Sequence, residues 1–389
     1  MNKHLFDESI NRFNTQSTKW DNIQTVFGSD DLLPMWVADM DFKAPQEVID
    51  AVSNRVEHGI FGYTHPNDHT HKAIQRWMSA RHGWDIEPSW LTYSPGVVFA
   101  ISMAVQAFTN EQDKVLIQTP VYPPFFNMVK LNNRTLIENP LLLSEGRYEM
   151  DFDDLEAKLS NGVKMMILCS PHNPIGRVWT KEELTKVAEL CQRYDVLILS
   201  DEIHSDIIFG DHVHTPIASL SDEISDRTIT CMAPSKTFNL AGFQASSIII
   251  SNTELRQKYT EMQHKQGFFS LNALGITAIE AAYTHGEPWL KSLLNYLEQN
   301  VSEVESFIHK ELPSLSVIKA EGTYLLWIDC RSLNLTDEDL QKLFVQKGKV
   351  GVEPGGKYGE EGRGFIRLNI GCPRSTLMEG LNRIKIALS

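Results

Sequence analysis

The chain has 389 residues, of which 42% are hydrophobic and 22% are charged, as is typical of a globular protein with one large core and a smaller one. Its formal net charge is −14 and no Lys/Arg cluster interrupts this acidity, so we expect no nucleic-acid partner. No apolar run approaches the ~20 residues that cross a membrane, so we expect no membrane association either.

The start of the chain and its cysteines bear on location and metal content. Residues Met1 to Phe13 are polar and charged, without the apolar stretch of a secretory signal. The five cysteines are odd in number and form no Cys-x-x-Cys pair, which favours reduced, buried thiols. The pairs His69/His71 and His212/His214 lack the spacing of metal ligands on a helix. We therefore expect a cytoplasmic protein without a metal.

Three helices are predicted in the first part of the chain. Pro45 opens a helix that runs to about Glu57, with proline in the first turn where it fits best. A second helix is predicted near residues 71–81. Gly96 to Phe108 forms a third, which begins directly after the turn Ser94-Pro95.

Four short apolar runs then predict buried strands of a parallel sheet. They are Val115–Thr119, Met165–Cys169, Val196–Ser200 and Thr228–Ala233. Up to about Ser251, strand and helix patterns alternate at the spacing of βαβ units. The fold class is therefore α/β, with a mostly parallel central sheet wrapped by helices.

A smaller α+β unit is predicted beyond about residue 287. Its elements are a helix at 288–311, a strand at 323–329, a helix at 336–347 and a strand at 364–369. We expect a large domain over residues 46–286, a small C-terminal domain over 287–389, and an N-terminal segment, 1–45, that packs on the small domain. The glycine-rich stretch 353–359 is interpreted as a mobile rim loop.

Each of the four apolar runs leads to a polar residue. In open α/β sheets, ligands bind beyond the carboxyl ends of the strands, so these side chains are expected to converge on one crevice. The residues are Tyr122, Asn173, Asp201 and Lys236.

These residue types suit an enzyme that uses pyridoxal phosphate (PLP). Such an enzyme needs a lysine that holds the aldehyde and a carboxylate that keeps the pyridine nitrogen protonated. Lys236 and Asp201 match these needs. Asn173 could donate to the phenolic oxygen, and Tyr122 could stack on the ring. Taken singly, each residue has a structural alternative: a solvated lysine, a helix-capping aspartate, a turn asparagine or a core tyrosine.

The cofactor's phosphate and the substrate's carboxylate also have candidate sites. Gly96 and Val97 stand at a helix N-terminus, whose N–H groups can bind a phosphate, and Ser235 is a candidate hydroxyl donor to it. Arg367 is a charge within an apolar strand, where it could bind a substrate carboxylate or form a structural salt bridge.

The ordered set of these segments resembles the fold-type I PLP enzymes of the class I/II aminotransferase family, over essentially the whole chain. More narrowly, several strings resemble the cystathionine β-lyase-like carbon-sulfur lyases of bacteria, of the PatB type. These strings are residues 34–42, 61–63, 201–204 and 358–365.

The resemblance implies further roles. It implies a homodimer in which Tyr63 reaches the cofactor phosphate of the neighbouring subunit. It also implies that the Val37-Ala38 backbone helps Asn173 and Arg367 to bind the substrate. His204 stands beside the cofactor where aminotransferases commonly have tyrosine, and Gln244 replaces an arginine near the phosphate. These departures make an aspartate-type transaminase less expected.

The resemblance implies that Lys236 removes the Cα proton and that a thiolate leaves from the β-carbon. The expected substrate is a small amino acid with a sulfur-linked β-substituent, which yields a thiol, pyruvate and ammonia. Aromatic residues predicted at the rim favour apolar S-substituents; they are Trp36, Phe61, Tyr122, Phe125 and the loop near Tyr358. Two alternatives stay open: an aminotransferase, and a regulatory protein that binds a transcription factor.

Overall fold

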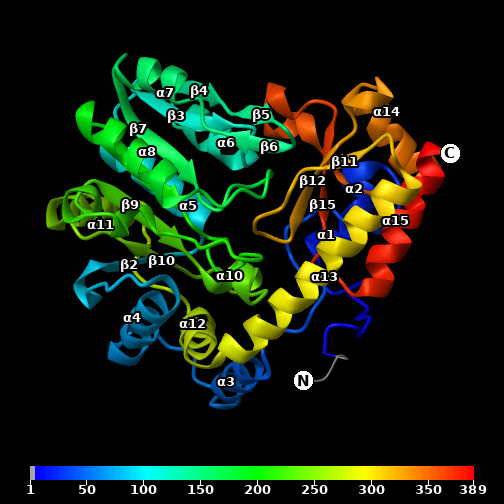
Figure 1. Ribbon diagram of the computed structural model, residues 1–389. Helices are drawn as coiled ribbons and strands as arrows, with labels where there is room; N and C mark the ends of the chain where they lie inside the picture. Colours follow the sequence, from blue (N-terminus) through cyan, green and yellow to red (C-terminus); the bar gives the residue numbers. More distant parts are fainter. Residues whose placement is uncertain (1–4) are drawn as a thin grey trace.

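A computed structural model describes residues 5–389, and its largest element is a seven-stranded sheet (Figure 1). The strand order is β2-β10-β9-β8-β7-β3-β4. Their bounds are β2 (Leu91–Ser94), β3 (Lys114–Thr119), β4 (Thr135–Pro140), β7 (Val163–Cys169), β8 (Leu197–Asp201), β9 (Thr228–Met232) and β10 (Ser246–Ile249).

The sheet is mostly parallel, which confirms the predicted fold class. Strands β9, β8, β7, β3 and β4 run in one direction, and only β10 is antiparallel to both of its neighbours, β2 and β9. In the register of the parallel strands, Asp201 lies opposite both Cys169 and Cys231. The carboxyl ends of β7, β8 and β9 therefore meet at one edge of the sheet.

Alternate residues of each central strand face opposite layers of helices. On β3, Val115 and Ile117 pack in the cluster that contains helix α5, whereas Leu116 packs in the cluster that contains α8. The first layer holds α5 (Val97–Phe108), α6 (Pro123–Leu131) and α11 (Thr253–Lys265). The second holds α7 (Phe152–Leu159) and α8 (Lys181–Arg193). Both faces of the sheet are buried, which is why its strands are nearly continuous apolar runs.

Further helices flank the β2 side of the sheet. Helix α12 contacts both α3 and α4 there. The side chain of Asn67 caps α4 by accepting from the N–H groups of His69 and Thr70, so the helix begins earlier than its apolar pattern predicts. Bounds are α3 (Gln46–Glu57), α4 (Asp68–His82), α10 (Pro234–Thr237) and α12 (Ala273–His285). The short helix α9 (Asp222–Ser225) instead packs in the layer of α7 and α8.

A second sheet of four antiparallel strands lies in the C-terminal part. Its order is β11 (Ser316–Val317), β12 (Leu325–Asp329), β15 (Phe365–Asn369) and β14 (Glu353–Pro354). The helices around it are α13 (Glu287–Glu311), α14 (Asp337–Lys342) and α15 (Arg374–Leu388). The predicted helix at 336–347 is only partly α-helical, because residues Leu343–Gly348 form a π-helical turn.

The N-terminal segment joins this second unit. Its short helices are α1 (Thr18–Asp21) and α2 (Ile23–Phe27), and its strand β1 (Leu33–Pro34) pairs in parallel with β13 (Val350–Gly351). We propose the domain division 1–45, 46–286 and 287–389 on this basis. The first four residues of that N-terminal segment lie outside the described residues.

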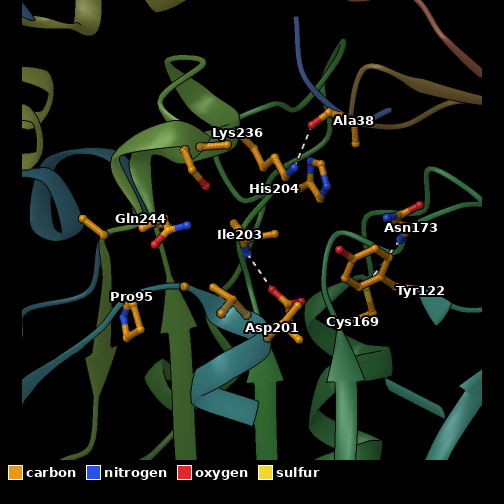
Figure 2. A pocket seen from close by; sticks show the side chains of 17 residues that line it. Ala38, Pro95, Tyr122, Cys169, Asn173, Asp201, Ile203, His204, Lys236 and Gln244 are labelled. Carbon is orange, nitrogen blue, oxygen red and sulfur yellow. Dashed lines mark hydrogen bonds between the residues drawn. The ribbon is translucent and has the colours of Figure 1, made fainter. Parts of the chain in front are cut away.

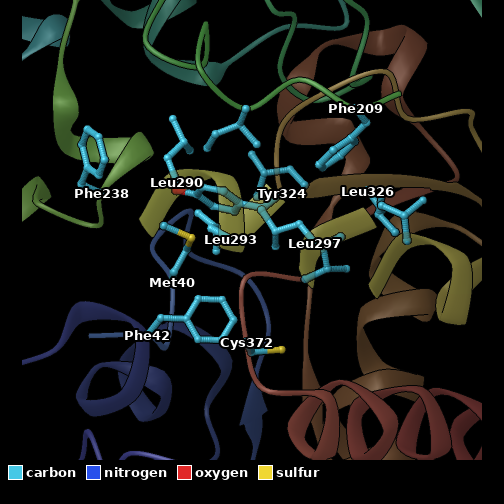
Figure 3. Close-up of a cluster of buried hydrophobic side chains, with 14 of the residues drawn as sticks. Met40, Phe42, Phe209, Phe238, Leu290, Leu293, Leu297, Tyr324, Leu326 and Cys372 are labelled. Atoms are coloured by element: carbon cyan, nitrogen blue, oxygen red, sulfur yellow. The ribbon is translucent and has the colours of Figure 1, made fainter. Parts of the chain in front are cut away.

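One apolar cluster links the N-terminal segment, the large domain and the small sheet (Figure 3). Leu290, Leu293 and Leu297 on α13 form its middle. Met40 and Phe42 of the N-terminal segment, Phe209 and Phe238 of the large domain, and Leu326 of the small sheet all belong to the same cluster. This shared core fixes the edge of the large sheet against the small one.

Some features differ from the prediction or were not part of it. The hairpin β5 (Leu142–Ser144)–β6 (Arg147–Glu149) was not predicted. Residues 353–359 are not a free rim loop: Glu353 and Pro354 form β14, Gly355–Tyr358 is a 3-10 helix, and Tyr358 is buried. All five cysteines are free and buried. Within residues 5–389, no helix is both long and apolar enough to span a membrane.

Candidate active site

A cavity of about 160 Å³ lies at the carboxyl edge of the large sheet (Figure 2). Nine of the predicted site residues line it. In Figure 2, Lys236 and Asp201 stand at opposite ends of the space, with Tyr122 on one side and Gln244 on the other. The nine are Ala38, Gly96, Val97, Tyr122, Asn173, Asp201, His204, Ser235 and Lys236.

Lys236 reaches this cavity from the short helix α10, which begins with Pro234 in its first turn. Its Nζ donates a hydrogen bond to the main-chain carbonyl of Ala38 at 2.7 Å. Burial and the positive charge of Arg367 lower the pKa of Lys236 to about 8, although Asp39 and Asp201 oppose the shift. A lysine in this environment can release and accept a proton near neutral pH.

Asp201 is the last residue of strand β8 and is only 4% exposed. Among the described residues, its carboxylate accepts one hydrogen bond, from the main-chain N–H of Ile203 at 3.2 Å. Burial raises the pKa of Asp201 to about 7, and the Ile203 hydrogen bond and Lys236 only partly offset this. A buried carboxylate with so little compensation is suited to a cationic ligand group.

Tyr122 and Asn173 form the wall beyond strands β3 and β7. Tyr122 directly precedes α6, where two prolines in the first turn hold its main chain in place. Burial and the nearby Asp201 raise the pKa of the Tyr122 phenol. The main-chain N–H of Asn173 donates to Cys169 Sγ at 3.4 Å, and its side-chain oxygen accepts from Arg367. The amide nitrogen of Asn173 thus remains available to a ligand.

Gly96, Val97 and Ser235 line the part of the cavity next to helix α5. Helix α5 has 12 residues and begins at Val97, so its first N–H groups are free of intrahelical partners. A Cβ placed on Gly96 would meet no protein atom within 4 Å, so there is open space at this point. An anion is stabilised at such a helix N-terminus.

His204 adds a buried ring to the cavity, in the turn that follows Asp201. It contacts Tyr324 edge-on, with ring centroids 5.9 Å apart, and its Nδ1 is buried without a partner. Burial, Lys236 and Arg367 hold the pKa of His204 well below its usual value. The neutral imidazole therefore leaves one nitrogen for a ligand contact.

Arg367 lies next to this cavity, on strand β15 of the small sheet. Its guanidinium donates to Asn173 Oδ1 at 3.1 Å and to the carbonyl of Trp36 at 2.7 Å. It stacks on Tyr358 at 5.2 Å, and its Nε is buried without a partner. Both of its partners are neutral oxygens, so the positive charge is available to an anion.

The segment from Trp36 to Asp39 connects Arg367 and Lys236. Asn369 holds it in place, because its amide nitrogen donates to the carbonyls of Val37 and Asp39. The Ala38 carbonyl also accepts from the Tyr324 hydroxyl at 2.9 Å. Ala38 lines the cavity, whereas Val37 does not.

Tyr63 is not part of the cavity of its own chain. It is fully exposed and lies with Phe61 at a separate surface pocket next to residues 267–274. Phe61 does not line the cavity of its own chain, and Phe125 is completely buried in the core, so the prediction that Phe125 lies at the rim is wrong. Of the five rim positions, only Tyr122 lines the cavity.

The prediction missed the small and apolar residues that complete the lining. They are Pro95, Val98, Cys169, Ile203, Ala233, Ala241 and Ala245. Pro95, Val98 and Ile203 are adjacent in sequence to predicted residues, and Cys169 ends strand β7, so proximity along the chain could have indicated these four. Ala241 and Ala245 carry no such signal. Within residues 5–389, no group of three or more His, Cys, Asp or Glu side chains is arranged to hold a metal ion.

Comparisons with known proteins agree with this geometry. A family model described as aminotransferase class I and II matches residues 30–384. Cystathionine beta-lyase PatB of Bacillus subtilis strain 168 is 52% identical over 99% of this chain and 100% of that protein.

Two solved structures cover nearly the whole chain. A PLP-bound putative aminotransferase from Clostridium difficile 630 has a TM-score of 0.97 and 48% identity, with 99% of each chain covered. A PLP-bound C-S lyase from Staphylococcus hominis, complexed with the inhibitor L-cycloserine, has a TM-score of 0.93 and 34% identity, with 99% of this chain and 98% of that one covered.

Proposed function

Because this chain belongs to the class I and II aminotransferase family, we propose that it is a PLP-dependent carbon-sulfur β-lyase that cleaves cystathionine or another cysteine S-conjugate. The observation that carries the proposal is one cavity that combines Lys236 with a buried, poorly compensated Asp201, beside the unpaired charge of Arg367. This reaction agrees with the names of two similar proteins: the Bacillus subtilis relative is a cystathionine beta-lyase, and the Staphylococcus hominis enzyme is a C-S lyase.

The residues fit the cofactor at each of its groups. Asp201 would face the pyridine nitrogen, because its buried carboxylate requires a cation. The α5 N-terminus at Gly96 and Val97, with Ser235, would bind the phosphate. Tyr122, Asn173 and His204 would contact the ring and its phenolic oxygen. When bound, PLP supplies an electron sink conjugated to the substrate's α-amino group.

The substrate would be oriented by its carboxylate. Arg367, assisted by the Asn173 amide and the Val37-Ala38 main chain, would bind that group. The Cα–H bond would then face Lys236, whose amine takes the Cα proton. The electron pair released at Cα forms a Cα=Cβ bond while the Cβ–S bond breaks, and sulfur leaves with its pair as a thiolate that gains a proton. Water then converts the remaining three-carbon fragment to pyruvate and ammonia.

A product assay tests this function. L-Cystathionine is supplied with PLP and without any keto acid, and pyruvate and the homocysteine thiol are measured. We expect equal amounts of both products. A strict need for a keto-acid acceptor, with a new amino acid formed from it, would show an aminotransferase instead. An S-alkyl cysteine in the same assay probes the breadth of the leaving group.

Lys236→Ala is expected to abolish product release, since the proposed proton acceptor and the covalent attachment point of the cofactor are lost together. Lys258→Ala is the matched control, because Lys258 is exposed on α11, away from the cavity, and its loss should leave the rate unchanged. Turnover by Lys236→Ala at the wild-type rate would contradict the assignment.

We also propose a homodimer in which Tyr63 of one subunit reaches the cofactor phosphate of the other. The exposure of Tyr63, Phe61 and Ile60 on one segment supports this, because an apolar surface of that kind is usually covered by a partner. A cytoplasmic location is likewise proposed, and the five free cysteines support it, since such thiols persist in reducing compartments.

A further inference from the structure

Asp206 is a buried carboxylate for which the proposed chemistry has no direct use. It is 2% exposed and lies in the turn after β8, two residues beyond His204 and five beyond Asp201. It does not line the cavity. Burying a carboxylate raises the free energy of the folded state unless several donors form hydrogen bonds with it. The contacts of Asp206 therefore indicate its role.

Donors from two helices meet at the Asp206 carboxylate. Oδ2 accepts from the Thr237 hydroxyl at 2.7 Å, and Oδ1 accepts from Trp77 Nε1 at 3.1 Å. His82 Nε2 is also within hydrogen-bond distance of Oδ1, at 2.9 Å. Arg81 approaches Oδ1 to 3.5 Å and donates to the Asp206 carbonyl. The carboxylate thus joins α10, through Thr237, to α4, through the other three residues.

Thr237 directly follows Lys236 on α10. That helix has only four residues, and a helix of this length has little stability of its own. The side-chain bond to Asp206 holds its main chain, together with the packing of α10 against α12. At the other end of the lysine, Nζ is held by the Ala38 carbonyl, as Figure 2 shows. Lys236 is restrained at both its main chain and its amine.

We propose that Asp206 is a positioning residue for Lys236: it accepts the Thr237 hydroxyl hydrogen bond and thereby fixes the turn of α10 from which the lysine reaches the substrate. The same turn carries His204 and directly follows Asp201, the last residue of β8, so this turn sets the place of the lysine relative to the groups that face the cofactor. Reactions of this kind depend steeply on such placement, since a misplacement of about 1 Å can cost about 100-fold in rate.

Thr237→Val tests the proposal, because it keeps the side-chain shape and removes the hydroxyl, while the carboxylate keeps its donors on α4. In the PLP-loaded protein we expect kcat for cystathionine to fall about 10-fold to 100-fold, with KM within about 2-fold. The visible circular dichroism of the bound cofactor, which reports its fixed orientation, should weaken in parallel. Thr237→Ser keeps a hydroxyl and should restore most of both signals.

Thr228→Val is the matched control. Thr228 is equally buried and its hydroxyl also makes a 2.7 Å hydrogen bond, to the Ile224 carbonyl, but it begins β9 at the end remote from the cavity. It should lower the melting temperature while leaving kcat and the dichroism unchanged. The proposal is overturned if Thr237→Val behaves like Thr228→Val, or if Thr237→Ser is as impaired as Thr237→Val.

This inference rests on the proposed role of Lys236 in the lyase reaction, and the two can fail separately. An inactive Lys236→Ala together with a fully active Thr237→Val would retain the lyase and remove the role of Asp206. If the wild-type protein releases no thiol, the lyase proposal fails, whereas the dichroism of the loaded Thr237 variants still decides whether the bond to Asp206 positions the lysine.

Discussion

At the residue scale, the charge state of Asp201 depends on what shares its cavity. Burial raises the pKa of this carboxyl from 3.8 to about 7 in the chain itself. Between these two values the folded chain keeps a proton that the unfolded chain has released. As the pH rises from about 4 to about 7, ionisation of Asp201 therefore lowers the free energy of unfolding, and this loss is complete above about pH 7. A bound pyridinium would reverse the preference, because it pairs with the carboxylate.

Asp201→Asn is accordingly expected to stabilise the cofactor-free protein at about pH 8, by up to about 4 kcal/mol, and to stabilise it by less than half as much at about pH 5. The amide can still accept the Ile203 hydrogen bond, so the change removes mainly the charge. Melting temperatures at the two pH values measure the effect.

The same substitution should weaken PLP binding, so the order of stability reverses once cofactor is added. Asp211→Asn, at an exposed aspartate ten residues later, is the control and should change neither stability nor binding. An equal melting temperature for Asp201→Asn and wild type at about pH 8, without cofactor, would argue against an ionised, uncompensated carboxylate at this position.

At the element scale, a buried ion network attaches the loop after β7 to the small domain. Arg177 and Glu321 are each about 1% exposed and are joined by a 2.9 Å bond from Nε to Oε2. Glu321 also accepts from Arg147 and from the main-chain N–H of Val178, and Arg177 donates to Glu183. Asn173 lies four residues before Arg177, so the network supports the loop that carries Asn173.

Glu321→Gln is expected to lower the free energy of unfolding by about 3 kcal/mol, since it leaves the buried charge of Arg177 with less compensation. Urea unfolding followed by circular dichroism measures the loss. Glu360→Gln removes the partner of Arg363 in a pair that is exposed on both sides, and should leave the free energy of unfolding nearly unchanged. Equal costs for the two variants would mean that burial adds nothing to the Arg177 network.

The elements show what sequence reasoning can and cannot supply. The central strands were predictable because both of their faces are buried, which makes them apolar runs, and the polar residues that follow them converge as parallel strands require. The antiparallel direction of β10 could not be predicted, because nothing in the short run Ser246–Ile249 indicates which way the strand runs. The Arg177–Glu321 pair was also inaccessible, because 144 residues separate its members.

The site shows the same division. Asp201 ends strand β8 and Lys236 lies on the short helix α10 that follows β9, so the strand pattern alone predicted where both residues lie. Arg367, in contrast, needed the packing of the small sheet to approach Asn173. Tyr358 sits in a glycine-rich stretch that indicates a loop, yet it packs against Trp327 and under Arg367. The Tyr358 ring becomes buried only when the two sheets pack together.

At the scale of the whole molecule, the proposed dimer makes each site depend on two chains. Lys236→Ala lacks the lysine and Tyr63→Ala lacks the proposed phosphate contact. When the two are co-expressed, each mixed dimer contains one intact site, formed by Lys236 of one chain and Tyr63 of the other. Random pairing makes half of the dimers mixed, so about a quarter of the wild-type activity is expected at limiting PLP.

Activity of the co-expressed sample is compared with an equimolar mixture of the two separately purified variants, assayed before subunits can exchange. That mixture is expected to show only the activity of Tyr63→Ala. If co-expression gives no more than this mixture, Tyr63 acts within its own chain or has no role at the site.

The five buried cysteines have a chemical consequence for an enzyme whose proposed product is a thiol. Burial raises the pKa of every one of them, including Cys169 in the wall of the cavity. The five cysteine sulfurs therefore remain as S–H groups at physiological pH. Exchange with a disulfide requires a thiolate, so oxidised forms of the released product would find no sulfur nucleophile on the enzyme to capture. The fold thereby protects the catalyst from the reactivity of what it makes.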